Sequence, residues 1–161
     1  MNQEPLEVQI GKILTARKLT LALAESCTGG LVGHRVTEVP GSSAYFLGAV
    51  VAYAYTAKER LLGVQHHTIY DYGAVSAETA LEMARGARRA LGADVGLGVT
   101  GIAGPTGGMP DKPVGLVYIA LSTRDGERYE RHVWDGDRSG NKARSAEAAL
   151  DLLRRYLEEE R

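Results

Sequence analysis

Three segments of this 161-residue sequence contain side chains whose types and spacing could do chemistry. The first places Ser26, Cys27 and Thr28 between a short apolar run and a pair of glycines. A hydroxyl or thiol just after a buried strand lies at the carboxyl edge of a sheet, where α/β proteins bind ligands. The N–H groups of the glycines would suit an oxyanion or a phosphate at the start of a helix. The segment also fits a plain strand-to-helix turn capped by Thr28.

The second segment pairs Tyr53 with Lys58. Tyr53 ends an apolar run, and Lys58 follows it in a predicted short helix. Desolvation near the edge of a sheet would lower the pKa of the lysine, so that its neutral amine could act as a base. The spacing fits a solvated lysine on a surface helix as well, because most lysines are exposed.

The third segment is a glycine-rich loop over residues 101–115, directly after Thr100. Its N–H groups would suit phosphate or ribose hydroxyls, and a flexible connector is the alternative interpretation. Residues 96–101 match the dinucleotide-binding pattern letter by letter. Their first glycines fall inside a predicted strand, however, which argues against a dinucleotide-binding motif at this position. The histidines lack metal-ligand spacing, so no metal site is predicted.

The elements that must position these segments follow from hydrophobic periodicity. The sequence predicts strands at 19–24, 45–53, 95–99, 116–121 and 127–133, and short helices at 30–36 and 56–62. A longer helix starts after Ser76 and ends at Gly92. The predicted inner residues of the first, middle and last helices are Leu6, Ile10, Ile13 and Leu14; Ala77, Ala80, Leu81, Ala84, Ala87 and Leu91; and Ala143, Ala146, Leu150, Leu153 and Leu157. The alternation predicts an α/β fold, a three-layer α/β/α sandwich with a mixed, mostly parallel sheet in a single domain over residues 1–161.

Composition narrows the class of protein. Hydrophobic residues make up 44% and charged residues 24%, which is typical of a globular domain. With 19 basic and 20 acidic residues the net charge is −1, so we expect neither nucleic acid nor a membrane as a partner. The single cysteine excludes an intrachain disulfide. The uncharged stretch 39–57 contains turn residues and is not expected to span a membrane, and the start is not a signal peptide, so we expect a cytoplasmic protein.

Taken in this order, the segments resemble the CinA C-terminal domain family. The matching motifs are AESCTGG (24–30), PGSS (40–43), VVAY (50–53) with AK (57–58), YGAVS (72–76), TGIAGP (100–105) with GG (107–108), KPVG (112–115) and GDR (136–138). The resemblance implies an amidohydrolase that converts nicotinamide mononucleotide to nicotinate mononucleotide and ammonia in pyridine nucleotide recycling. A nucleotide-binding or regulatory module without turnover is the alternative.

The resemblance also implies which residues act. The family's catalytic serine, tyrosine and lysine fall on Ser26, Tyr53 and Lys58, and Cys27 is the rival nucleophile. Its substrate-binding residues fall on Thr28, Gly29, Gly30, Ser43, Thr100, Gly101, Ala103, Gly104 and Arg138. It implies no metal or cofactor, a small-molecule nucleotide as substrate, and a homo-oligomer. The sequence departs from the family pattern at Tyr55, Thr56 and Lys142.

Overall fold

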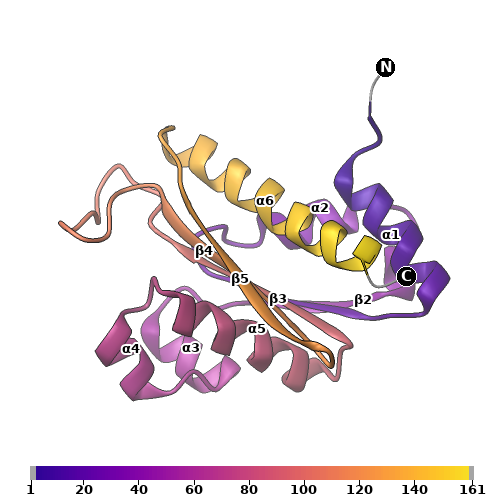
Figure 1. Ribbon diagram of the computed structural model, residues 1–161, viewed down its shortest axis with the longest axis horizontal. Helices are drawn as coiled ribbons and strands as arrows, with labels where there is room; N and C mark the ends of the chain where they lie inside the picture. Colours follow the sequence, from indigo (N-terminus) through magenta and orange to yellow (C-terminus); the bar gives the residue numbers. More distant parts are fainter. Residues whose placement is uncertain (1–2, 160–161) are drawn as a thin grey trace.

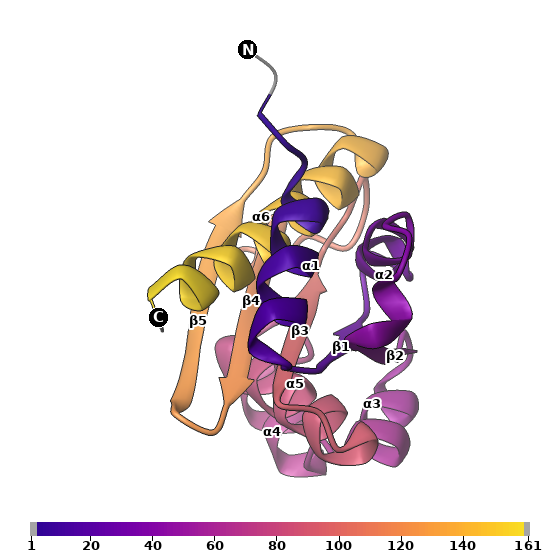
Figure 2. The ribbon, with the colours of Figure 1, turned by 90° about the vertical axis from the view of Figure 1, so that its right-hand side faces the viewer.

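In the computed structural model, which describes residues 3–159, the chain forms a five-stranded sheet between two layers of helices (Figure 1). The elements in chain order are α1 (Leu6–Arg17), β1 (Leu21–Glu25), α2 (Leu31–Thr37), the 3-10 turn η1 (Ser42–Ala44), β2 (Phe46–Val51), α3 (Tyr55–Leu62), α4 (His66–Tyr72), α5 (Ala77–Leu91), β3 (Val95–Gly101), β4 (Leu116–Thr123), β5 (Gly126–Val133) and α6 (Arg138–Glu159). Helices α1, α2 and α6 cover one face of the sheet, and α3, α4 and α5 cover the other (Figures 1 and 2). The predicted three-layer sandwich is confirmed.

The sheet is mixed, with the strand order β2-β1-β3-β4-β5. Strand β1 is parallel to both β2 and β3, whereas β4 is antiparallel to β3 and β5. Four strands therefore run in one direction and β4 runs against them, which confirms a mostly parallel sheet. The connections after β1 and β2 lead to helices on opposite faces, and such a divergence leaves a crevice at the carboxyl ends of the two strands.

The glycines of β3 serve helix packing. A Cβ added to Gly96 would lie 2.1 Å from the carbonyl oxygen of Ala84, and one added to Gly98 would lie 2.7 Å from that of Ala80. Because both carbonyls belong to α5, these glycines allow the helix to lie directly on the sheet. The interpretation that the first glycines of the dinucleotide-like pattern lie within a strand is confirmed.

Some details of the helices differ from the prediction. In α5 Met83 is buried, whereas the predicted inner residue Leu91 is 37% exposed, because it ends the helix over Gly48 of the edge strand β2. In α6 the buried stripe is centred on Ala149 and Leu153, and Ala143 lies outside it and is exposed. Helix α4 was not predicted. Among the described residues no helix is long and apolar enough to cross a bilayer.

Candidate active site

Ser26 and Lys58, which are 32 residues apart in the chain, meet at the carboxyl ends of β1 and β2. Ser26 follows the last residue of β1, and its N–H donates to the carbonyl oxygen of Val99 at 3.0 Å. Lys58 lies in α3, just after the turn that leaves β2. Its Nζ is 2.9 Å from Ser26 Oγ. Lys58 is only 1% exposed, and Ser26 is 7% exposed. A nucleophile and a candidate base are thus within hydrogen-bond distance in a water-poor site.

Two carbonyl oxygens hold the amine of Lys58. Nζ lies 2.9 Å from the carbonyl oxygen of Ala52 and 3.1 Å from that of Tyr53. Desolvation by burial lowers the pKa of Lys58, and a thiolate at Cys27 would act in the opposite direction. Carbonyls can only accept, so a neutral amine donates its two N–H bonds to them and keeps its lone pair for Ser26 Oγ. The arrangement is suited to removing the proton of the serine.

Cys27, the rival nucleophile, is disfavoured by its surroundings. Its side chain is 8% exposed and lies beside the same pocket as Ser26. Burial raises the pKa of the thiol to about 12, so the reactive thiolate is scarce near neutral pH. Ser26 is the residue with an amine at hydrogen-bond distance, and the geometry favours it as the nucleophile.

A buried carboxylate, Glu25, organises the turn that carries Ser26. It is fully buried, and its oxygens accept hydrogen bonds from Thr28 Oγ1 (2.7 Å) and from the N–H groups of Gly30 (3.2 Å), Val32 (3.0 Å) and Gly33 (3.0 Å). The N-terminus of α2 is therefore neutralised by a side chain of the protein itself. Sequence reasoning included Glu25 in the motif but gave it no role, because a hydrogen-bonding role has no distinctive spacing.

The hydrogen bonds of this turn also involve the first glycine pair. The N–H of Gly30 is bonded to Glu25, and that of Gly29 is bonded to the carbonyl oxygen of Ser26 at 3.0 Å. Thr28 is buried, and its hydroxyl also faces Glu25. The N–H groups of Gly29 and Gly30 thus have acceptors within the chain, and their binding of an oxyanion or a phosphate stays a prediction.

Replacing Glu25 by glutamine should destabilise the protein. An amide keeps the shape but turns one acceptor oxygen into a donor that faces N–H groups, so we expect a loss of about 2–4 kcal/mol in the free energy of unfolding. Chemical denaturation measures the loss. Glu38→Gln, at the exposed end of the same helix, is the control and should change the stability by less than about 0.5 kcal/mol. An equally small change for Glu25→Gln would contradict the assigned role.

The residues around Ser26 and Lys58 enclose a pocket of about 160 Å³. It is lined by Ser26, Cys27, Tyr53, Tyr55, Lys58, Ala74, Val75, Thr100, Gly101, Ala103 and Arg138. The structure therefore brings together seven predicted site residues: Ser26, Tyr53, Lys58, Thr100, Gly101, Ala103 and Arg138. Pockets that hold a whole small-molecule ligand usually measure about 300 Å³ or more, so this one would enclose only part of such a ligand.

Arg138 joins the glycine-rich loop to Tyr53. Its guanidinium donates to the carbonyl oxygen of Gly104 at 2.7 Å and to the hydroxyl of Tyr53 at 3.1 Å. Tyr53 itself is 62% exposed, and it reaches Lys58 through its carbonyl oxygen. Thr100 is buried, and its hydroxyl donates to the carbonyl oxygen of Ala74 at 2.7 Å. Main-chain carbonyl oxygens from three connecting segments, at Tyr53, Ala74 and Gly104, thus hold the polar side chains of the pocket walls.

Ser43 does not belong to this site. It lies in η1, before β2. The carbonyl oxygen of Tyr45, two residues later, accepts a hydrogen bond from the N–H of Leu21 at the beginning of β1. Since β1 and β2 are parallel, Ser43 is at the amino end of the strands and Ser26 at the carboxyl end. Ser43 therefore does not line this pocket, and substrate binding by Ser43 stays a prediction. Conversely, sequence reasoning noted Tyr55 only as a departure and missed its place on the pocket wall.

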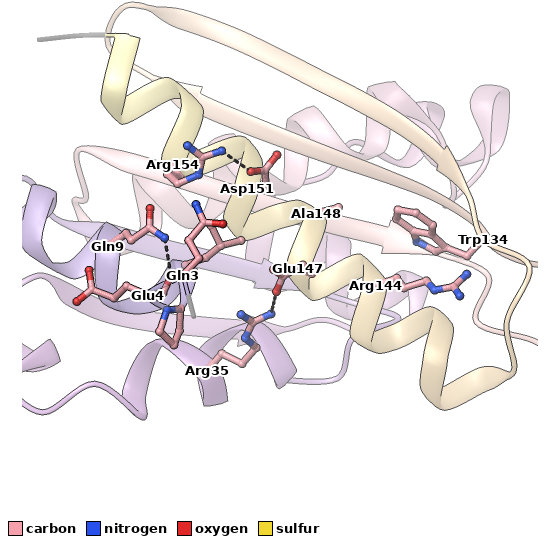
Figure 3. Close-up of a pocket in the computed structure, with 12 residues that line it drawn as sticks. Gln3, Glu4, Gln9, Arg35, Trp134, Arg144, Glu147, Ala148, Asp151 and Arg154 are labelled. Carbon is pink, nitrogen blue, oxygen red and sulfur yellow. Dashed lines mark hydrogen bonds and ion pairs between the residues drawn. The ribbon is translucent and has the colours of Figure 1, made fainter. Parts of the chain in front are cut away.

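A larger hollow of about 580 Å³ lies elsewhere, along α1 and α6 (Figure 3). Its arginines already have carboxylate partners: Arg35 is paired with Glu147, and Arg154 with Asp151 (Figure 3). None of the residues around the Ser26 pocket lines it. Within residues 3–159, histidine, cysteine and carboxylate side chains form no group of three that could hold a metal ion.

Comparisons with known proteins agree on one family. The family model described as the CinA C-terminal domain matches residues 3–157. A competence-damage inducible protein of Halothermothrix orenii is 53% identical over 157 residues, and a CinA-like protein of Salinibacter ruber is 53% identical over 152 residues. These matches cover 97% and 94% of this chain but only 38% and 37% of those relatives.

Solved structures give the same result. A CinA superfamily protein of Klebsiella pneumoniae superposes with a TM-score of 0.92 at 30% identity and covers 96% of both chains. The competence/damage inducible protein CihA of Agrobacterium tumefaciens superposes with a TM-score of 0.85 at 40% identity, over 95% of this chain and 97% of that one.

Proposed function

This chain belongs to the CinA C-terminal domain family, and on that premise we propose that it is an amidase that converts nicotinamide mononucleotide to nicotinate mononucleotide and ammonia. The observation that carries the proposal is the 2.9 Å contact between Ser26 Oγ and the buried Nζ of Lys58. A serine with a partly desolvated amine is equipped for acyl transfer, and hydrolysis of a carboxamide is acyl transfer to water.

The reaction proceeds in two steps. Ser26 Oγ attacks the carboxamide carbon while its proton passes to Lys58, and the C–N bond then breaks as Lys58 returns that proton to the departing nitrogen, which leaves as ammonia. Water then attacks the resulting ester and gives one proton to Lys58. The bond between the acyl carbon and Ser26 Oγ breaks, which releases nicotinate mononucleotide, and Lys58 returns the proton to the Ser26 hydroxyl. Backbone N–H groups would hold the oxyanion, either in the turn that follows Ser26 or in the glycine-rich loop after Thr100.

The test of this function is ammonia release from nicotinamide mononucleotide by the purified protein. We expect turnover that continues in the presence of a chelator, and no comparable turnover of free nicotinamide. Binding of the nucleotide without release of ammonia would instead identify a nucleotide-binding module without turnover.

We expect hydrolysis to depend on the phosphate of the substrate. The nucleotide exceeds the 160 Å³ pocket, so its ribose and phosphate extend past the rim, where Arg138 lies. One charge-assisted hydrogen bond is worth about 1.5–3 kcal/mol, so nicotinamide riboside should have a kcat/KM lower by about ten- to a hundredfold. Equal kcat/KM values for nucleotide and riboside would rule out a phosphate contact.

A substitution tests whether Arg138 makes this contact with the phosphate. Arg138→Met should reduce the difference in kcat/KM between nucleotide and riboside. The control is Arg144→Met, which changes an arginine on the same helix that pairs with Asp135 and does not line the Ser26 pocket, and which should leave the difference unchanged.

A further inference from the structure

Within residues 3–159, no acidic side chain lines the Ser26 pocket. Among its lining residues in the described part of the chain, the charged or ionisable groups are Lys58, Arg138, Cys27 and two tyrosines. A positively charged ring that entered this pocket would find no carboxylate to neutralise it. The electron-rich groups available to it are the faces of the aromatic rings of Tyr53 and Tyr55.

Tyr55 is the better placed of these two tyrosines. It is the first residue of α3 and lies three positions before Lys58, so both side chains share one face of the helix. Its ring is 61% exposed and lines the pocket, so that one face remains available to a ligand. Tyr53 is equally exposed, at 62%, but its hydroxyl accepts a hydrogen bond from Arg138, whose positive charge would repel a cationic ring placed beside it.

We propose that Tyr55 selects substrates whose amide-bearing ring is positively charged, by laying its own ring face against that ring at the mouth of the pocket. The inference rests on the proposed function and names its substrate class as carboxamides of cationic N-ribosylated rings. A cation over the face of a tyrosine is stabilised by the ring quadrupole, and a neutral ring of the same shape gains only the stacking contact. Tyr55 thus discriminates by charge, and Ser26 and Lys58 perform the reaction.

The experiment measures binding without turnover. In the Ser26→Ala protein, calorimetry gives the Kd of nicotinamide mononucleotide and of its 3-carbamoylphenyl analogue, in which a carbon replaces the charged ring nitrogen. Adding Tyr55→Leu should weaken binding of the nucleotide by about two- to fivefold more than binding of the neutral analogue, the range for an exposed cation–π contact, because both ligands lose the stacking contact and only the nucleotide loses the cation–π contact. Adding Tyr55→Phe, which keeps the aromatic face, should retain the discrimination between the two ligands.

Tyr70→Leu is the matched control. It removes a tyrosine that is 83% exposed on the neighbouring helix α4 and does not line the pocket, so neither Kd should change. Equal weakening of both ligands by Tyr55→Leu, or no change in either, would overturn the inference. Failure of the wild-type protein to release ammonia would overturn the proposed function alone, because charge discrimination in binding is measured independently of turnover.

Discussion

Replacing Ser26 by alanine is expected to lower the turnover of nicotinamide mononucleotide by several orders of magnitude, on the order of 10⁴-fold or more. Without Oγ no acyl-enzyme forms, and Lys58 loses the hydroxyl from which it would take a proton. Substrate binding should survive, because the alanine removes one oxygen at the floor of the pocket. Steady-state kinetics with ammonia detection measures the loss, and calorimetry measures the retained binding.

Cys27→Ala is the matched substitution beside it. The thiol is buried and its pKa is raised to about 12, so the alanine variant should keep most of the wild-type kcat. The substitution should instead lower the free energy of unfolding by about 1 kcal/mol, because it removes part of a small buried side chain. If the cysteine variant lost turnover and the serine variant kept it, the nucleophile would have to be reassigned to Cys27.

Replacing Lys58 should lower turnover almost as much as replacing Ser26. Lys58→Arg keeps a permanent positive charge that cannot accept a proton, and Lys58→Met keeps the length but replaces the amine by a thioether that is not basic, so both should lose nearly all turnover. The methionine variant should still bind the nucleotide, because only proton transfer is removed. Lys12→Met is the control, since this lysine lies on the outside of α1 and pairs with Glu4. A Lys58→Arg enzyme with near wild-type turnover would show that the lysine acts as a fixed charge.

The pH dependence tests the same role without mutation. Burial lowers the pKa of Lys58, and the neutral amine is the active form, so activity is lost as the pH falls through the lowered value and is gained as the pH rises. The half-maximal pH should therefore lie below about 10.4, the ordinary lysine pKa. A profile that rose only around the ordinary value would contradict an amine desolvated by its site.

Much of the fold could be predicted from the sequence because its core helices and strands have clear apolar periodicity, as at Leu150 and Leu153 in α6. Helix α4 escaped prediction because it buries only Thr68 and so has no apolar stripe. The sequence also indicated Ser26 and Lys58 separately. Their contact depends on the pairing of β1 with β2, where Glu25 lies beside Val51, and local spacing does not specify that register.

The surroundings of Ser43 and of the first glycine pair also could not be predicted from the sequence. Ser43 was predicted to bind substrate from a motif match, and only the direction of the strands shows that it lies at the opposite edge of the sheet. The glycine N–H groups were assigned to a ligand because a sequence does not show which of its own acceptors will satisfy a donor. In the folded chain that acceptor is Glu25.

The use of main-chain carbonyls to hold the amine of Lys58 affects how this site tolerates change. A carbonyl oxygen is present whatever side chain a residue has, so substitutions at positions 52 and 53 leave both acceptors in the chain. What the arrangement requires is the number of residues between the end of β2 and Lys58, because one inserted or deleted residue would turn the lysine about 100° around α3. During divergence the base of this site is therefore robust to point substitution and vulnerable to a change in the length of a short turn.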